Sequence, residues 1–246
     1  MQSEEVRARF LKVLGEPWLA EALFDAVPDT VFFVKDGDGR YVVVNRTLVE
    51  RVGLKSKADL LGRTAAEAFP PPLGPRIFRQ DQAVLRDGKP IHAALELHLY
   101  PGGVEGWCLT WKQPLHDAHG KVIGVTGLSR DLHPLSGERA ETEGLSRALD
   151  HVRDHLDQPL RLNDLAAMAG LSLYQFDSRV RALYGISPGQ YVTRARIELA
   201  CALLRQGRRA ISDIAQECGY SDQAAFTRQF RKLVGLTPMA YRAARD

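Results

Sequence analysis

The sequence predicts two domains of different class: an α+β domain with an antiparallel five-stranded sheet and helices, then an all-α domain with two helix-turn-helix units. Strand-like runs occur in the order two strands, short helices, three strands, which is typical of an α+β fold. Beyond about residue 138 only helical periodicity remains. This helical part repeats one unit, which consists of a short helix, a glycine turn and a longer helix.

Length and composition are those of a globular protein with two domains. The chain has 246 residues, of which 45% are hydrophobic and 26% are charged. No apolar run reaches the roughly 18 residues that a membrane helix needs, and the charged N-terminus lacks an apolar signal-peptide core. We therefore expect a cytoplasmic protein with no membrane partner. The three widely spaced cysteines are expected to be buried free thiols.

The first domain begins with helical and hairpin signals. Residues 1–26 show apolar positions near helical spacing, which predicts an N-terminal amphipathic helical segment. The run VFFVKDGDGRYVVVN predicts a hairpin, because Asp-Gly-Asp-Gly separates two β-rich stretches. Short helical stretches, interrupted by prolines, then extend to about Asp87.

Three strand candidates follow these helices. In IHAALELHLY the residues alternate, so that Leu95 and Leu97 share an apolar face. The other face carries His92, Glu96 and His98, and the two histidines are expected to be exposed rather than metal ligands. The runs GWCLTWKQ and KVIGVTGLSRD complete the predicted sheet.

The domain boundaries follow from this order of elements. We predict the sheet domain over residues 27–133, a linker over 134–144 and the helical domain over 145–246. Residues 1–144 carry 18 basic against 20 acidic side chains, a net charge of −2. Residues 145–246 carry 15 against 10, a net charge of +5. The basic excess indicates a polyanionic partner for the helical domain alone.

The repeat relates residues 162–191 to residues 211–241. Phe176 of the first copy corresponds to Phe226 of the second, with one residue added in the second turn. Each turn contains a glycine, which adopts the positive φ that a tight helix-to-helix corner requires. The predicted N-caps of the four helices are Asn163, Ser172, Ser212 and Ser221.

The longer helix of each copy divides into two faces at 100° per residue. The predicted core faces consist of Phe176, Val180 and Leu183 in the first copy, and Phe226, Phe230 and Leu233 in the second. The opposite faces are polar and, in a helix-turn-helix, can enter the major groove of DNA. A helix over residues 187–205 connects the copies and would be roughly 28 Å long. This length lets one chain place both units in adjacent major grooves, about 34 Å apart.

Residues 145–243 resemble the DNA-binding domain of AraC/XylS-type transcription regulators, most closely in IAQECGYSDQAAFTRQFRKLVGLTPMAYR. The first unit departs more from the family, with Ser178 where Arg is common and Val180 where Phe is common. The resemblance implies these base-reading positions: Tyr174, Asp177, Ser178, Gln223, Ala224, Thr227 and Arg228.

The chemistry of these side chains suggests distinct roles. Arg228 can bind guanine through two hydrogen bonds, and Gln223 can pair with adenine. Asp177 either accepts a hydrogen bond from cytosine or pairs with a neighbouring arginine, and its charge leads us to expect less attraction to DNA from the first unit. The expected phosphate contacts are Arg181, Arg231 and Lys232.

Residues 20–133 resemble a PAS sensor domain in the hairpin, the helices, DGKPIHAALEL and the closing VIGVTGLSRDL, with Asp131 at the family's terminal Asp. His133 follows where the family has Thr. The resemblance implies an effector site, and residues 46–87 lack the Cys and His expected of flavin and haem types. We expect no cofactor and no metal, but a weakly polar organic effector. The expected lining residues are Phe33, Phe69, Ile77, Leu95, Leu97, Leu109 and Trp111.

The sequence therefore predicts a one-component transcription regulator and not an enzyme, since no catalytic motif is found. Its expected partners are double-stranded promoter DNA, a small-molecule effector and a second copy in a homodimer, with RNA polymerase as a further candidate. Two alternatives remain for the first domain. It either serves only dimerisation or a protein partner, or it carries a redox- or gas-sensing cofactor.

Overall fold

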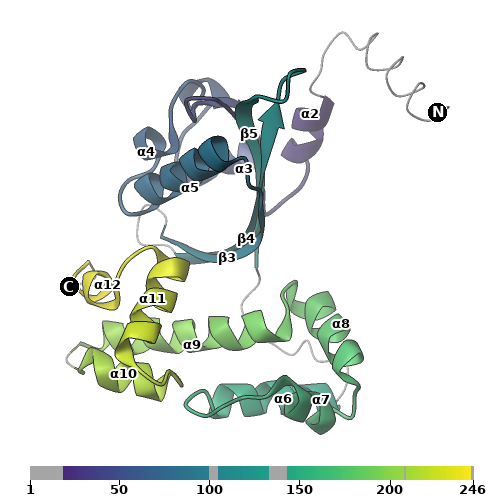
Figure 1. Cartoon of the computed structure of the whole chain (residues 1–246), viewed down its shortest axis with the longest axis vertical. Helices are drawn as coiled ribbons and strands as arrows, with labels where there is room; N and C mark the ends of the chain where they lie inside the picture. Colours follow the sequence, from purple (N-terminus) through teal and green to yellow (C-terminus); the bar gives the residue numbers. More distant parts are fainter. Residues whose placement is uncertain (1–18, 100–104, 133–142, 208, 245–246) are drawn as a thin grey trace, which may run out of the picture. The chain divides into compact units, whose positions relative to one another are not determined.

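The computed structural model describes residues 19–99, 105–132, 143–207 and 209–244 (Figure 1). The chain divides into two compact units. The sheet unit holds most of the chain up to Arg130, and the helical unit holds Asp131–Asp246 together with Leu95–Leu99 and Gly103–Leu109. Most of the predicted N-terminal segment and linker, and His133, lie outside the described residues. Within the described ranges, no helix is long and apolar enough to cross a membrane.

A five-stranded sheet contains all the predicted strands, in the order β2-β1-β5-β4-β3. The strands are β1 (Thr30–Asp36), β2 (Tyr41–Val44), β3 (Ile91–Leu99), β4 (Glu105–His116) and β5 (Val122–Asp131). Strand β1 pairs antiparallel with β2 and with β5, and Phe33 lies opposite both Val44 and Gly127. In the β1–β2 turn the Asp36 carboxylate accepts hydrogen bonds from the backbone N–H groups of Asp38 and Arg40, at 3.0 and 2.9 Å. The predicted hairpin is confirmed.

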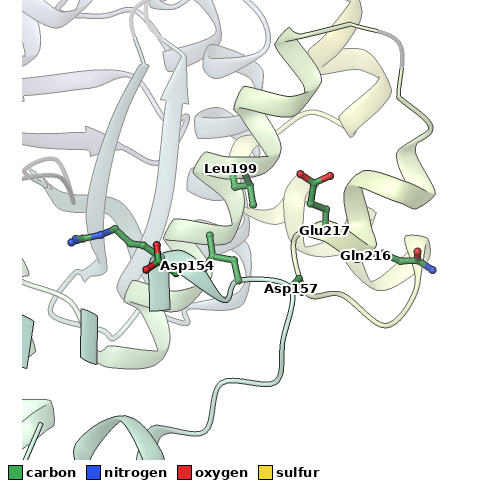
Figure 2. Close-up of a pocket in the computed structure, with 7 residues that line it drawn as sticks. Asp154, Asp157, Leu199, Gln216 and Glu217 are labelled. Atoms are coloured by element: carbon green, nitrogen blue, oxygen red, sulfur yellow. The ribbon is translucent and has the colours of Figure 1, made fainter. Parts of the chain in front are cut away.

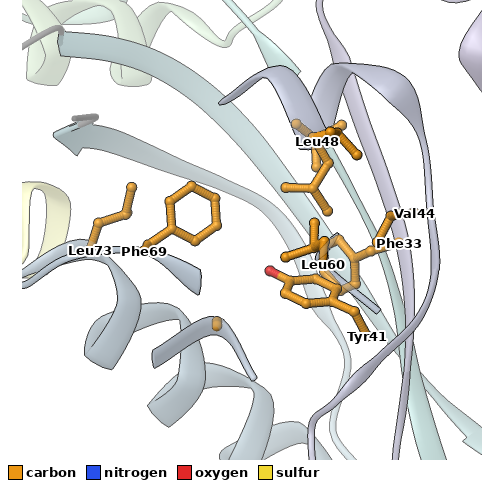
Figure 3. Close-up of a cluster of buried hydrophobic side chains, with 10 residues drawn as sticks. Phe33, Tyr41, Val44, Leu48, Leu60, Phe69 and Leu73 are labelled. Atoms are coloured by element: carbon orange, nitrogen blue, oxygen red, sulfur yellow. The ribbon is translucent and has the colours of Figure 1, made fainter. Parts of the chain in front are cut away.

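Helices pack on both faces of β1, and those on the Phe33 side form the core of the sheet unit. The helices are α2 (Leu19–Asp25), α3 (Arg46–Val52), the 3-10 helix η1 (Lys57–Asp59), α4 (Ala65–Ala68) and α5 (Leu73–Asp87). Figure 3 shows Phe33 and Tyr41 among buried side chains from these helices, including Phe69. Burying a side chain of this size contributes about 1.5–3 kcal/mol. On the other face of β1, Phe32 packs in a separate cluster that includes Leu115.

The helical unit contains the predicted repeat. Its helices are α6 (Glu143–Asp154), α7 (Leu162–Met168), α8 (Leu173–Tyr184), α9 (Pro188–Arg205), α10 (Ile211–Glu217), α11 (Gln223–Val234) and α12 (Pro238–Ala243). The two helix-turn-helix units are α7–α8 and α10–α11, and α9 connects them (Figure 1).

The N-caps of these helices correct the sequence analysis in three places. Ser172 caps α8 as predicted, and its hydroxyl accepts a hydrogen bond from the Gln175 N–H at 3.2 Å. In α11 the cap is Asp222 rather than Ser221. Each of these caps lies four residues before the buried phenylalanine of its helix, so the phenylalanine sets where the helix begins. Asn163 and Ser212 were wrongly predicted as caps, because α7 and α10 already begin at the preceding residue.

Strand β3 differs from the expected alternation. Leu95 and Leu97 are buried as predicted, but Glu96 and His98 are also buried, with exposed fractions of 3% and 7%. His92 is exposed. Four consecutive buried residues mean that both faces of this part of the sheet are covered, so alternation could not identify the exposed face.

The three cysteines are free and buried, as predicted. Burial raises the pKa of both Cys201 and Cys218 to about 12. At neutral pH these two thiols are therefore protonated and unreactive.

Candidate nucleic-acid interface

The two helix-turn-helix units bury matching positions. Phe176 and Val180 are buried in α8, and Phe226 and Phe230 take the same positions in α11. The third buried residue of α8 is Tyr184, whereas the predicted Leu183 is only half-buried. The Tyr184 ring packs against that of Tyr191, with ring centres 5.0 Å apart.

The faces opposite these cores are accessible, as a DNA interface requires. Tyr174 is the most exposed large apolar side chain of the described residues, at 83%. Ser178 and Arg228 are exposed at equivalent positions of the two helices. All ten side chains predicted to contact DNA are exposed or half-buried: Tyr174, Asp177, Ser178, Arg181, Gln223, Ala224, Thr227, Arg228, Arg231 and Lys232.

The two exposed faces differ in charge. In α8 the Asp177 carboxylate accepts a hydrogen bond from Arg181 Nε at 2.6 Å, one helical turn away. The equivalent positions in α11 are Thr227 and Arg231, so no acid stands beside that arginine. The ion pair favours the role of Asp177 as the partner of a neighbouring arginine over its role as an acceptor for cytosine. It also neutralises one of the cations of the first unit.

Helix α9 holds the two units in one body. Ser187 caps this helix and Pro188 occupies its first turn. Its 18 residues span about 27 Å, close to the length expected from the sequence. Both faces of α9 contribute buried residues, including Tyr191, Ile197 and Leu204. A helix buried along its whole length fixes the separation of the helix-turn-helix units.

A second connection joins the segment between α6 and α7 to the turn of the second helix-turn-helix unit. Arg196 of α9 donates hydrogen bonds to the carbonyl oxygens of Leu156 and Gln158, at 3.1 and 2.8 Å. Its guanidinium also lies over the Tyr220 ring, 5.9 Å from the ring centre. The turn residue Gly219 packs against the same Leu156 carbonyl. Sequence analysis missed these contacts, since nothing local distinguishes Arg196 from the other arginines of α9.

One pocket of the helical unit is unsuited to DNA. It lies among the α6–α7 connection, α9 and α10, and Figure 2 shows the side chains that line it. Three of these carry carboxylates, namely Asp154, Asp157 and Glu217. Their negative charge would repel phosphate groups, so the DNA-facing surface is better sought on α8 and α11.

The seven residues expected to line an effector cavity do not share one face. Phe33 and Phe69 are in the core cluster shown in Figure 3, and Ile77 packs against it. Trp111 lies on the same side of β4 as Leu115, which packs on the opposite face of β1 from Phe33. The same alternation places Leu109 with Trp111, and Leu95 and Leu97 opposite His98. Alternation thus assigns Phe33 and Trp111 to opposite faces of the sheet, and the effector cavity stays a prediction.

The helix-covered face of the sheet unit contains buried charges that sequence analysis did not single out. Lys35 of β1 and Lys112 of β4 both donate to the Asp81 carboxylate of α5, and the Lys112 Nζ–Asp81 Oδ1 distance is 2.7 Å. The three side chains are at most 2% exposed. The Lys35 ammonium also lies 4.1 Å from the centre of the Tyr41 ring. Burial lowers the pKa of Lys35, and Asp81 opposes that shift.

Two matched helix-turn-helix units with accessible polar faces place the protein in the class of helix-turn-helix proteins. The comparisons agree: residues 165–244 match a family described as a helix-turn-helix domain, and residues 24–136 match the PAS fold. The chain belongs to the AraC/XylS family of transcription regulators, which are not enzymes, and it carries an N-terminal PAS domain.

Three similar proteins each match less than half of this chain. Regulatory protein SoxS of Salmonella typhimurium is 34% identical over 94 residues, which are 38% of this chain and 88% of that protein. The MmsAB operon regulatory protein of Pseudomonas aeruginosa is 38% identical over 111 residues, or 45% of this chain and 35% of the relative. The probable transcriptional regulator LumQ of Photobacterium leiognathi is 31% identical over 114 residues, 46% of each chain. The chain thus spans less than half the length of the MmsAB operon regulatory protein and of LumQ.

Proposed function

We propose that this protein is a one-component transcription regulator whose PAS domain senses a small organic effector. The effector would modulate sequence-specific binding of promoter DNA by the two helix-turn-helix units. The observation that carries this proposal is the pair of exposed polar helix faces on α8 and α11, built on matching buried positions. These two helices are the ones that would enter successive major grooves.

The proposed roles of the exposed residues follow their chemistry. Arg228 and Gln223 would read bases through hydrogen bonds in the major groove, and Ala224 would contact a thymine methyl group. Arg231 and Lys232 would bind phosphates and set the position of the helix without reading sequence. The first unit would read bases with Tyr174 and Ser178, and its paired Arg181 would contribute less attraction to the backbone.

Replacement of Arg228 with Ala should remove discrimination at one base pair. The preferred DNA site is first obtained by selection from random sequences with the full chain. Binding to that site should weaken by about 1–3 kcal/mol, roughly 5- to 150-fold, because two hydrogen bonds to one guanine are lost. Binding to DNA with another base at that position should change much less. Fluorescence anisotropy with DNA that differs at single positions measures both effects.

Arg231→Ala is the matched control on the same helix. It should weaken binding to all sequences equally and reduce the salt dependence by about one phosphate contact. A uniform loss in Arg228→Ala would instead make Arg228 a phosphate contact. Failure of the native protein to enrich any sequence would contradict the proposed function itself.

The sensing role rests on the PAS fold and has its own test. Native mass spectrometry of gently purified protein should detect a bound small molecule, or a compound library should contain one that raises the melting temperature. If no bound small molecule is detected and no compound raises the melting temperature, the domain is better described as a dimerisation or partner-binding module. A coloured protein with visible absorption would instead indicate a redox- or gas-sensing cofactor.

The proposed mechanism is a shift between two populated states. The effector would change the packing of α2 or α6, the helices next to the ends of the PAS domain in sequence. That change would alter the geometry of a homodimer or release the DNA-binding unit from an inhibitory contact. RNA polymerase is the partner we propose for a DNA-bound form that activates transcription.

A further inference from the structure

Three potential metal ligands of different chemistry meet on adjacent strands. Glu96 and His98 are two residues apart in β3, and therefore share one face of the strand. Cys108 of the neighbouring strand β4 lies next to His98 on that face. One ligand atom from each residue lies within 4.8 Å of the other two. All three residues belong to the same compact unit.

Two of the three separations between these atoms are close to those of a tetrahedral zinc site. Bonds of about 2.0–2.1 Å to nitrogen or oxygen and about 2.3 Å to sulfur place nitrogen and sulfur roughly 3.6 Å apart, and nitrogen and oxygen roughly 3.3 Å apart. The distance from His98 Nε2 to Cys108 Sγ is 3.5 Å. The distance from His98 Nε2 to Glu96 Oε2 is 3.2 Å. Cys108 Sγ also lies 3.6 Å from His98 Nδ1, so the imidazole ring would have to turn before one of its nitrogens and the thiolate could share an ion.

Burial and charge also support a metal site at these three residues. Cys108 has no exposed surface, and Glu96 and His98 are only 3% and 7% exposed. A thiolate and a carboxylate together carry two negative charges, so with a neutral imidazole they would neutralise a divalent ion. The occupied site would thus bury no net charge. Thiolate, imidazole and carboxylate form a ligand set that suits Zn²⁺ better than Mg²⁺ or Ca²⁺, which prefer oxygen alone.

We propose that Glu96, His98 and Cys108 form a binding site for a divalent transition-metal ion of the zinc class, with a fourth position open to water or to another ligand. Such a site goes beyond the proposed regulator function and is independent of it, because DNA binding by α8 and α11 requires none of these residues. The sequence analysis had set His98 aside because alternation placed it on an exposed face. Because His98 is buried, its expected exposure no longer argues against a role as a ligand.

Cobalt titration of the full chain tests this site, because Co²⁺ occupies zinc sites and absorbs visible light. After treatment with a chelator, the protein should bind one Co²⁺ with a sulfur-to-metal charge-transfer band and the strong visible bands of four-coordinate cobalt. Zn²⁺ should displace the cobalt. Cys108→Ser should abolish the charge-transfer band, and His98→Asn should weaken binding by at least about tenfold.

Cys201→Ser provides the matched control, since it removes another buried thiol of the same unit. It should leave the cobalt spectrum unchanged. The proposal is overturned if the native protein gives no charge-transfer band, or if the band survives in Cys108→Ser. It is equally overturned if Cys201→Ser removes the band. Should circular dichroism show that Cys108→Ser is unfolded, Glu96→Gln decides, because it keeps the thiol and should still weaken cobalt binding about tenfold.

Discussion

Replacement of Asp81 with Asn should lower the free energy of unfolding of the sheet unit by about 3–5 kcal/mol. Asp81 is the carboxylate between Lys35 and Lys112, and all three side chains are almost fully buried. The variant would leave two ammonium groups in the interior without their shared anion. Loss of the partner is costly because the buried charges cannot recover their hydration.

Calorimetry of the full chain measures the effect as a lower melting temperature of the sheet unit. Asp87→Asn is the matched control, because Asp87 lies on the same helix and pairs with Arg86 on the surface. It should leave the transition unchanged. A second comparison replaces Lys35, Asp81 and Lys112 together with apolar residues of similar size, which should be close to neutral. If Asp81→Asn proves as harmless as Asp87→Asn, the buried ion cluster contributes nothing to stability.

Gly219→Ala should destabilise the helical unit far more than Gly170→Ala, although the two glycines occupy the same turn of the repeat. Both have positive φ, of +73° and +69°. An alanine in this conformation costs about 1–2 kcal/mol. At Gly170 the added methyl group would meet no atom within 4 Å. At Gly219 it would lie 2.1 Å from the Leu156 carbonyl oxygen and 2.6 Å from Arg196 Nη2.

We therefore expect a loss of about 1–2 kcal/mol for Gly170→Ala and about 3–5 kcal/mol for Gly219→Ala, because backbone must move in the second case. Urea denaturation followed by far-ultraviolet circular dichroism compares the two variants. Gly219→Ala should also weaken DNA binding, since α11 begins only four residues later. Equal losses in the two variants would show that the Leu156–Arg196 contact does not hold the second turn in place.

The sequence alone determined the order of the elements and the two-part organisation. The Asp-Gly-Asp-Gly hairpin and the two helix-turn-helix units rest on turn chemistry and on helical spacing of phenylalanines, both of which depend on residues close in the chain. The predicted base-reading residues of α8 and α11 could be placed on an outward face for the same reason. Such local signals survive folding because neighbouring residues set them.

The tertiary structure decided which faces are covered. Leu97 and His98 are neighbours in β3 and both are buried, which no alternation within one strand can reveal. Lys35, Asp81 and Lys112 meet although Asp81 is 46 and 31 residues away from the two lysines. The unequal surroundings of Gly170 and Gly219 likewise depend on the distant Leu156. Sequence spacing carries no information about such contacts, which form only on folding.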